Sequence, residues 1–202
     1  MKIAKTQAIA EKEKISAILS NDLKNQILGM YDQKTNIDKL YVLEKIPVKL
    51  LANAIETYFH KLSQDEIVIC LYDDTAFGSA KDGFTITTKQ IYYKNIFEHG
   101  SSTNIADVLS INQERHNSIQ NIVIRTSSST AKIHIDSALK KKDALVNFVD
   151  RLVTLLKKSN YGSTAEKSHG LDTHLSTCSG CGASFTKPKG ISRNCDYCGS
   201  LI

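Results

Sequence analysis

The chain lacks tryptophan, has only two prolines and contains no long apolar segment. Its most apolar run covers residues 67–72, far fewer than the ~20 residues that cross a bilayer as a helix. The N-terminus mixes lysine with glutamate and has no apolar stretch of the kind found in a secretory signal. Apolar residues make up 41% and charged residues 23%, which excludes collagen-like, mucin-like and wholly disordered chains. We therefore expect a soluble cytoplasmic protein with a packed core and no membrane span.

The chain also lacks a strongly basic segment, although its 26 lysines and arginines exceed its 21 aspartates and glutamates. Basic and acidic residues number 10 and 7 in residues 1–64, 12 and 11 in residues 65–158, and 4 and 3 in residues 159–202. The densest basic clusters are residues 140–142 and 157–158, at the two ends of a predicted helix. Such clusters are typical of a solvated helix surface, and contact with phosphate or anionic lipid is the alternative.

Cysteine gives the sharpest signal in the sequence. Four of the five cysteines form two C-x2-C pairs separated by thirteen residues: Cys178, Cys181, Cys195 and Cys198. Four thiolates on two turns can surround a metal ion tetrahedrally, which suits a closed structural Zn(II) site. An iron–sulfur cluster also takes four thiolate ligands and is the alternative. In a reducing cytosol these thiols are not expected to form disulfides. We therefore predict that these four cysteines bind structural zinc.

The segment around the cysteines is too short to fold by apolar burial alone. Residues 175–202 make a tail of 28 residues, so metal binding is expected to supply most of its folding free energy. Between the two pairs lie three basic residues that could touch phosphate or a partner: Lys187, Lys189 and Arg193. Nucleic-acid binding through them is weakened by charge, because four thiolates around one divalent ion add negative charge to the tail.

The rest of the chain shows alternating helical and strand periodicity. Apolar residues at spacings of three and four predict a helix over residues 2–30 and a second helix with Pro47 in its first turn. Short runs predict strands at 67–72, 84–88, 91–93, 105–111, 119–125 and 131–136. A final amphipathic helix, capped by Asp136 or Ser137, carries an apolar stripe from residue 145 to 156. This succession predicts a small antiparallel barrel or sandwich closed by a helix.

The sequence offers no convincing catalytic group. Asp73 and Asp74 are adjacent at the end of a predicted strand, where consecutive side chains point in opposite directions, so a turn is favoured over an acid–base pair. Residues 78–83 lack the Gly-Lys-Ser/Thr order of a phosphate-binding loop. Cys70 lies in an apolar run, as expected of a buried thiol. We therefore predict no catalytic residues and no enzyme; a site assembled across domains is the alternative.

Two segments resemble known families. Residues 71–87, LYDDTAFGSAKDGFTIT, continuing to IYYKN at 91–95, resemble the opening hairpins of bacterial pleckstrin-homology-like domains. Residues 50–59 are similar to the helix that often precedes such domains, and CSGCG with CDYCG in the tail resembles a short zinc ribbon. The family has seven strands and six are counted here, so the number of strands within residues 96–121 is left open.

The resemblance implies an α+β protein with a curled antiparallel sheet closed by a C-terminal helix, used for binding. It divides the chain into an N-terminal helical region (1–62), a pleckstrin-homology-like domain (63–158), a flexible linker (159–174) and a zinc ribbon (175–202). We therefore expect a non-catalytic, zinc-binding adaptor of bacterial type that docks a protein partner; nucleic-acid binding through the ribbon is the alternative. Lipid binding has little support, because the first hairpin carries only Lys81 in an aspartate-flanked loop, and self-association stays open.

Overall fold

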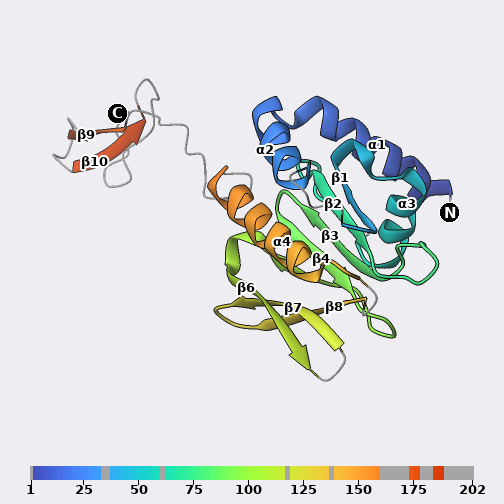
Figure 1. Ribbon diagram of the computed structural model, residues 1–202. Coiled ribbons are helices and arrows are strands. Elements are labelled where there is room, and N and C mark those ends of the chain that lie inside the picture. The colour runs from blue at the N-terminus through green and yellow to red at the C-terminus, as the bar shows by residue number, and fades with distance from the viewer. Residues whose placement is uncertain are drawn as a thin grey trace. The chain divides into compact units, whose positions relative to one another are not determined.

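The computed structural model describes residues 2–32, 37–59, 62–116, 119–136, 139–159, 173–177 and 184–188. The chain forms two compact units, Met1–Ser163 and Thr164–Ile202, which we call the body and the C-terminal unit (Figure 1). The described part of the body has the predicted α+β class, with four helices and two antiparallel sheets. None of these helices combines the length and the apolar content needed to traverse a bilayer.

The first sheet of the body is a five-stranded antiparallel meander. Its strands follow chain order: β1 (Leu40–Val42), β2 (Val68–Asp73), β3 (Gly83–Thr87), β4 (Gln90–Lys94) and β5 (Ser101–Asn104). The three strands predicted at 67–72, 84–88 and 91–93 are confirmed as β2, β3 and β4. The strands β1 and β5 were not predicted, because β1 has only three residues and β5 reads Ser-Ser-Thr-Asn, without apolar alternation.

The second sheet has three antiparallel strands, β6 (Val108–His116), β7 (Ile119–Thr126) and β8 (Thr130–Ile135). The strand predicted at 105–111 begins later, because Ile105–Asp107 form a short 3-10 helix, η2. The Asn104 side chain accepts a hydrogen bond from the Ala106 N–H and so caps this turn. Because η2 separates β5 from β6, the described strands form two sheets and no closed barrel. Of the predicted barrel or sandwich, the barrel alternative was therefore wrong.

Asn95 joins the two sheets where strand pairing does not. Its buried side chain donates to the Lys132 carbonyl oxygen at 3.0 Å and accepts from the His134 N–H at 2.9 Å. The amide thus satisfies two backbone groups of β8 as a neighbouring strand would.

The helix predicted over residues 2–30 is two helices, α1 (Lys2–Ile18) and α2 (Asn21–Asp32). The break occurs at Ser20, whose hydroxyl accepts from the Leu23 N–H at 3.3 Å, as serine often does before a helix. After β1, the 3-10 helix η1 (Leu43–Lys45) leads to α3 (Val48–Thr57). The prediction of a helix here is confirmed, with Pro47 one position before its first residue.

The last helix of the body, α4 (Lys142–Lys158), buries the predicted stripe that includes Leu145, Leu152 and Leu156. The predicted start at residue 136 or 137 was wrong, because Lys141 precedes the first helical residue. The Asp136 carboxylate instead forms an ion pair with Lys39 at 3.0 Å, while Ser137 lies outside the described residues. The Asp136 side chain therefore binds Lys39 in a tertiary contact and does not cap the helix.

Both faces of the five-stranded sheet are covered. On one face, Tyr72 and Phe84 pack with the three-stranded sheet, α2 and α4. On the other face, Leu71 packs with residues of α1 and α3 such as Ala8 and Leu51. Neighbours along β2 thus enter different apolar clusters, as the alternation of side chains in a strand requires. Figure 1 shows α1 and α3 side by side, and α4 extending along β6.

The described part of the C-terminal unit is an antiparallel pair, β9 (Thr173–Thr177) and β10 (Ser184–Pro188). Thr177 pairs with Ser184, so residues 178–183 connect two strands whose ends are adjacent.

Candidate interaction surfaces

The predicted zinc ligands lie outside the described residues. The first pair, Cys178 and Cys181, belongs to the connection between β9 and β10, whereas Cys195 and Cys198 follow β10. A hairpin brings the two ends of its connection together, and four thiolates are a donor set that fits Zn(II). In the described ranges no group of three or more His, Cys, Asp or Glu side chains is placed to bind a metal ion.

The three basic residues predicted to touch phosphate or a partner also belong to the C-terminal unit. Lys187 is in β10 and pairs with His174 of β9 in the strand register. Lys189 and Arg193 lie outside the described residues. The backbone register therefore places one of the three on the hairpin, and the contact itself stays a prediction.

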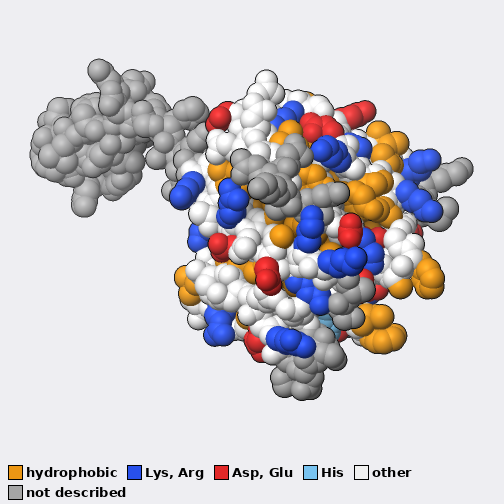
Figure 2. Space-filling model, viewed as in Figure 1, with side chains coloured by type: hydrophobic (Ala, Val, Ile, Leu, Met, Phe, Trp, Pro, Cys, Tyr) orange, Lys and Arg blue, Asp and Glu red, His pale blue; other side chains and the backbone are white. Residues whose placement is uncertain are grey.

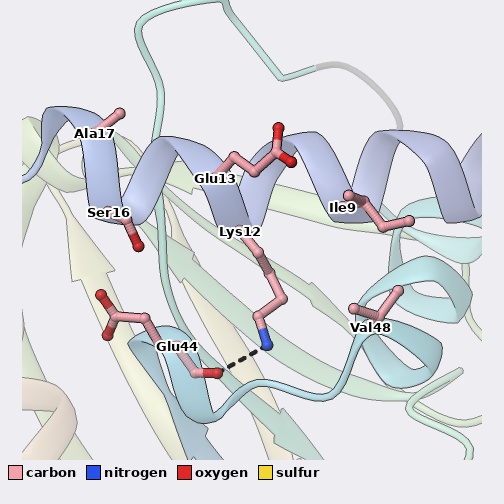
Figure 3. Close-up of a pocket in the computed structure, with 7 residues that line it drawn as sticks. All are labelled: Ile9, Lys12, Glu13, Ser16, Ala17, Glu44 and Val48. Carbon is pink, nitrogen blue, oxygen red and sulfur yellow. Dashed lines mark hydrogen bonds between the residues drawn. The ribbon is translucent and has the colours of Figure 1, made fainter.

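A groove lies between α1 and the segment formed by η1 and the start of α3 (Figure 3). It has a volume of about 560 Å³, and seven residues line it: Ile9, Lys12, Glu13, Ser16, Ala17, Glu44 and Val48. These residues come from α1, from η1 and from the start of α3. Figure 2 shows apolar side chains exposed over the region of α1 and α3, with charged side chains beside them.

The sequence of α1 places large apolar residues outside the buried stripe of the helix. Ala8 and Ile15 are buried on the inner side, whereas Ile3, Ile9 and Ile18 are exposed. A surface helix usually confines its large apolar residues to one stripe, so α1 has more of them than its packing uses. Ile9, which is 43% exposed, lies within the groove.

Lys12 holds the two sides of the groove together. Its ammonium donates to the carbonyl oxygens of Glu44 and Ile46, both at 2.8 Å, which ties α1 to the end of η1. The Glu44 carboxylate lies 3.6 Å from the Lys24 ammonium, and Glu13 is exposed on the rim. The groove therefore combines apolar walls, formed by Ile9, Ala17 and Val48, with acidic side chains at its edge.

Asp73 and Asp74 point in opposite directions, as the turn interpretation predicts. Asp73 Oδ1 accepts from the N–H of Thr75 at 2.9 Å, which closes the turn after β2. Asp74 Oδ1 accepts from the Asp136 N–H at 2.7 Å, and burial raises the pKa of the Asp74 carboxyl to about 6. The two carboxylates thus secure different loops and do not form a pair.

The Cys70 thiol of β2 and the Glu66 carboxylate just before this strand are also buried. Burial raises the pKa of the Cys70 thiol to about 12, so this thiol is not a thiolate near neutral pH. Glu66 is also buried, and its carboxylate accepts from the hydroxyls of Thr87 and Tyr92. Both of its oxygens have donors, so Glu66 holds the segment before β2 against β3 and β4.

The sequence interpretation missed two exposed aromatic residues, Phe77 and Phe97, in the connections after β2 and after β4. A signal was available, because Phe77 stands directly before Gly78 among turn-forming residues, where a core residue is not expected.

Comparisons with protein-family models, with curated proteins and with solved structures find no match to this chain.

Proposed function

We propose that the chain is a non-catalytic, zinc-binding interaction protein whose body docks a protein partner in the α1 groove. The observation that carries this proposal is a preformed groove between α1 and the η1–α3 segment, where Ile9 is 43% exposed and lies with Ala17 and Val48. Exposed apolar surface of this kind is typical of protein-binding sites. The exposed Glu13 carboxylate on the rim favours a partner segment that carries a basic residue next to its apolar ones.

The order of elements supports a pleckstrin-homology-like fold for the body from β2 to α4. Four antiparallel strands, β2 to β5, are followed by three more, β6 to β8, and then by one helix. These elements would correspond to the seven strands and C-terminal helix of the family, with β5 as the additional strand within residues 96–121. The strand β1 and helices α1 to α3 precede this set.

The C-terminal unit would hold zinc through Cys178, Cys181, Cys195 and Cys198. The hairpin register supports this, because it brings together the ends of the segment with the first pair. Bound Zn(II) would supply folding free energy to a unit that has little apolar surface to bury. A unit of this size would need the bound metal ion in order to fold, and it would have to be folded to make a second contact with the partner.

The test is affinity capture from native cytosol with the full chain and matched variants, identifying both proteins and nucleic acids. Ile9→Glu places a charge inside the groove, whereas Ile18→Glu changes an exposed isoleucine of α1 that does not line it. We expect a discrete protein to be retained by the original chain and by Ile18→Glu and to be lost with Ile9→Glu. A Cys178→Ser/Cys181→Ser variant reports whether the C-terminal unit contributes.

Three results would contradict the proposal. Recovery of the same protein with Ile9→Glu would remove the groove from the contact. Recovery that disappears on nuclease treatment would support nucleic-acid binding instead. Absence of any retained protein or of self-association would leave the groove without an occupant.

A further inference from the structure

Among the described strands of the body, four lie at the edges of the two sheets: β1 and β5 in the first sheet, β6 and β8 in the second. An edge strand has backbone N–H and C=O groups that no neighbouring strand binds, and proteins usually shield them. At β1, β6 and β8 the structure shows side chains bound to these groups. The edge formed by β5 is the exception.

Side chains bind the backbone at the other three edges. The Tyr31 hydroxyl donates to the Leu40 carbonyl oxygen of β1 at 3.1 Å. The Lys157 ammonium donates to the Val108 carbonyl oxygen of β6 at 2.7 Å, and a bulge interrupts the pairing at the start of this strand. At β8, the side chain of Asn95 binds two backbone groups. Each of these edges is therefore partly blocked to another strand.

The β5 edge has no such shielding in the described part of the chain. Its sequence is Ser-Ser-Thr-Asn, without the lysine or proline that often protects an edge, and its pairing with β4 contains no bulge. The side chains of Ser101, Ser102 and Asn104 are exposed. Only the length of four residues limits what this edge can bind.

The register shows which backbone groups of β5 are free. The Ile105 N–H donates to the Lys89 carbonyl oxygen at 2.8 Å, so this pair is hydrogen-bonded. Bonded and non-bonded pairs alternate along antiparallel strands, so the two odd-numbered residues of β5 bond to β4. The N–H and C=O of Ser102 and the N–H of Asn104 then point away from β4. No described group bonds to these three.

A pocket of about 310 Å³ lies beside β5, on the face of the sheet that carries α3. Phe59 lies in its floor between two other aromatic rings, with 5.6 Å between ring centroids to both Tyr58 and Tyr92. None of the lining residues is charged, and they are Tyr58, Phe59, Gln90, Tyr92, Gly100, Ser101 and Ser102.

The start of β5 is held firmly against the end of α3. Gly100 lies so close to Tyr58 that a Cβ at this position would come within 2.7 Å of the Tyr58 Cβ. The Tyr58 hydroxyl shares a hydrogen bond with the Thr85 hydroxyl at 3.1 Å, which fixes the ring. The edge and the pocket are therefore preformed, so that little ordering opposes binding.

We propose that β5 accepts an extended segment of a partner protein as a further strand of this sheet, with one large uncharged side chain of that segment in the pocket. A residue opposite Ser102 projects from the same face as Ser102 and Tyr92, and so over the pocket. A charged side chain there would lose its hydration without gaining an opposite charge. A second copy of β5 would place only serine or asparagine at this point, which leaves most of the pocket empty. The surface shares no residue with the α1 groove.

Amide exchange of the full chain, resolved by NMR, tests whether the edge is free. We expect the amides of Ser102 and Asn104 to exchange about a hundredfold faster than those of the two odd-numbered residues of β5. The His134 amide at the β8 edge, whose N–H is bound by a side chain, should be protected. Slow exchange at Ser102 and Asn104 would overturn the proposal, and slow exchange that dilution abolishes would assign the edge to a second copy of the chain.

A phage-displayed library of random peptides is the probe for binding. Ser102→Pro removes an N–H that points away from β4, so it should preserve the sheet and prevent strand addition. Ser102→Ala keeps this N–H and is the matched control. We expect peptides selected on the full chain to bind Ser102→Ala as they bind the original chain, and Ser102→Pro at least about tenfold more weakly. Circular dichroism and slow exchange of the Thr103 amide check that both variants are folded.

N-methylation along a selected peptide tests strand addition without altering the protein. We expect binding to be lost at alternate positions only, because alternate amides of an added strand face β5. Ile9→Glu should leave peptide binding unchanged, which separates this surface from the α1 groove. The proposal would be overturned by a library that gives no binder, by equal sensitivity to methylation along the peptide, or by binding that Ile9→Glu abolishes and Ser102→Pro preserves.

Discussion

The body and the C-terminal unit owe their structure to different forces. The body buries apolar side chains on both faces of one sheet, and polar side chains such as Asn95 and Glu66 fasten its loops. The described part of the C-terminal unit is a single hairpin, and a two-stranded hairpin is marginal by itself in water. A packed core therefore stabilises the body, whereas we propose that a metal ion stabilises the C-terminal unit.

The largest expected effect of a single substitution in the body is at Asn95. Asn95→Ala leaves the Lys132 carbonyl and the His134 N–H without their partner, so we expect a loss of about 3 kcal/mol in the free energy of unfolding. Urea unfolding measures this loss. Asn112→Ala is the control, because the Asn112 side chain is exposed and forms a hydrogen bond with the Ser110 hydroxyl. Zinc content should be unchanged, and a coupled loss of metal would break the distinction between the units.

The second effect concerns pH and the buried Asp74 carboxyl. Its pKa is about 6 in the folded protein against 3.8 ordinarily, so between these values the folded state binds the proton more tightly. This carboxyl therefore lowers the stability of the body as pH rises from about 4 to 6. Asp74→Asn, which can still accept from the Asp136 N–H, should raise the free energy of unfolding at neutral pH by about 1–2 kcal/mol.

Unfolding curves of the original chain and of Asp74→Asn across this pH range measure whether the difference in the free energy of unfolding depends on pH. A gain that is the same at pH 4 and pH 7 would mean that the carboxyl charge is not its cause.

The smallest effect is expected at the break between α1 and α2. Ser20→Ala removes the hydroxyl that accepts from the Leu23 N–H, and the loss of such a cap costs about 1 kcal/mol. Ser20→Asp should restore most of it, because aspartate also caps helices. If Ser20→Ala were as stable as the original chain, the break would have to be attributed to packing of Leu19 and Leu23.

Strong periodicity made β2, β3, β4, α3 and α4 predictable from the sequence. The break at Ser20 was missed because Ile18 and Leu19 continue the apolar pattern across it, and β5 because its four residues are polar. The start of α4 was misplaced because Asp136 binds Lys39, a residue 97 positions away. The local periodicity of the sequence carries no information about a contact between residues so far apart in the chain.

The candidate sites divide in the same way. The cysteine spacing alone predicts the metal ligands, since chemistry fixes both their number and their type. The α1 groove depends on which side of the helix faces the sheet, and the unshielded edge of β5 depends on which strand ends the sheet. Tertiary structure decides both, although Ile9, outside the inner stripe of α1, was a signal of exposed apolar surface there.

The most direct test of the central distinction is hydrogen exchange on the full chain, with zinc bound and after removal by a chelator. We expect amides of residues 164–202 to lose protection when the metal is removed, and amides of β2, β3 and α4 to exchange at the same rates in both states. Protection of the C-terminal unit that persists without metal, or protection of the body that falls with it, would contradict the assignment of a core to one unit and a metal ion to the other.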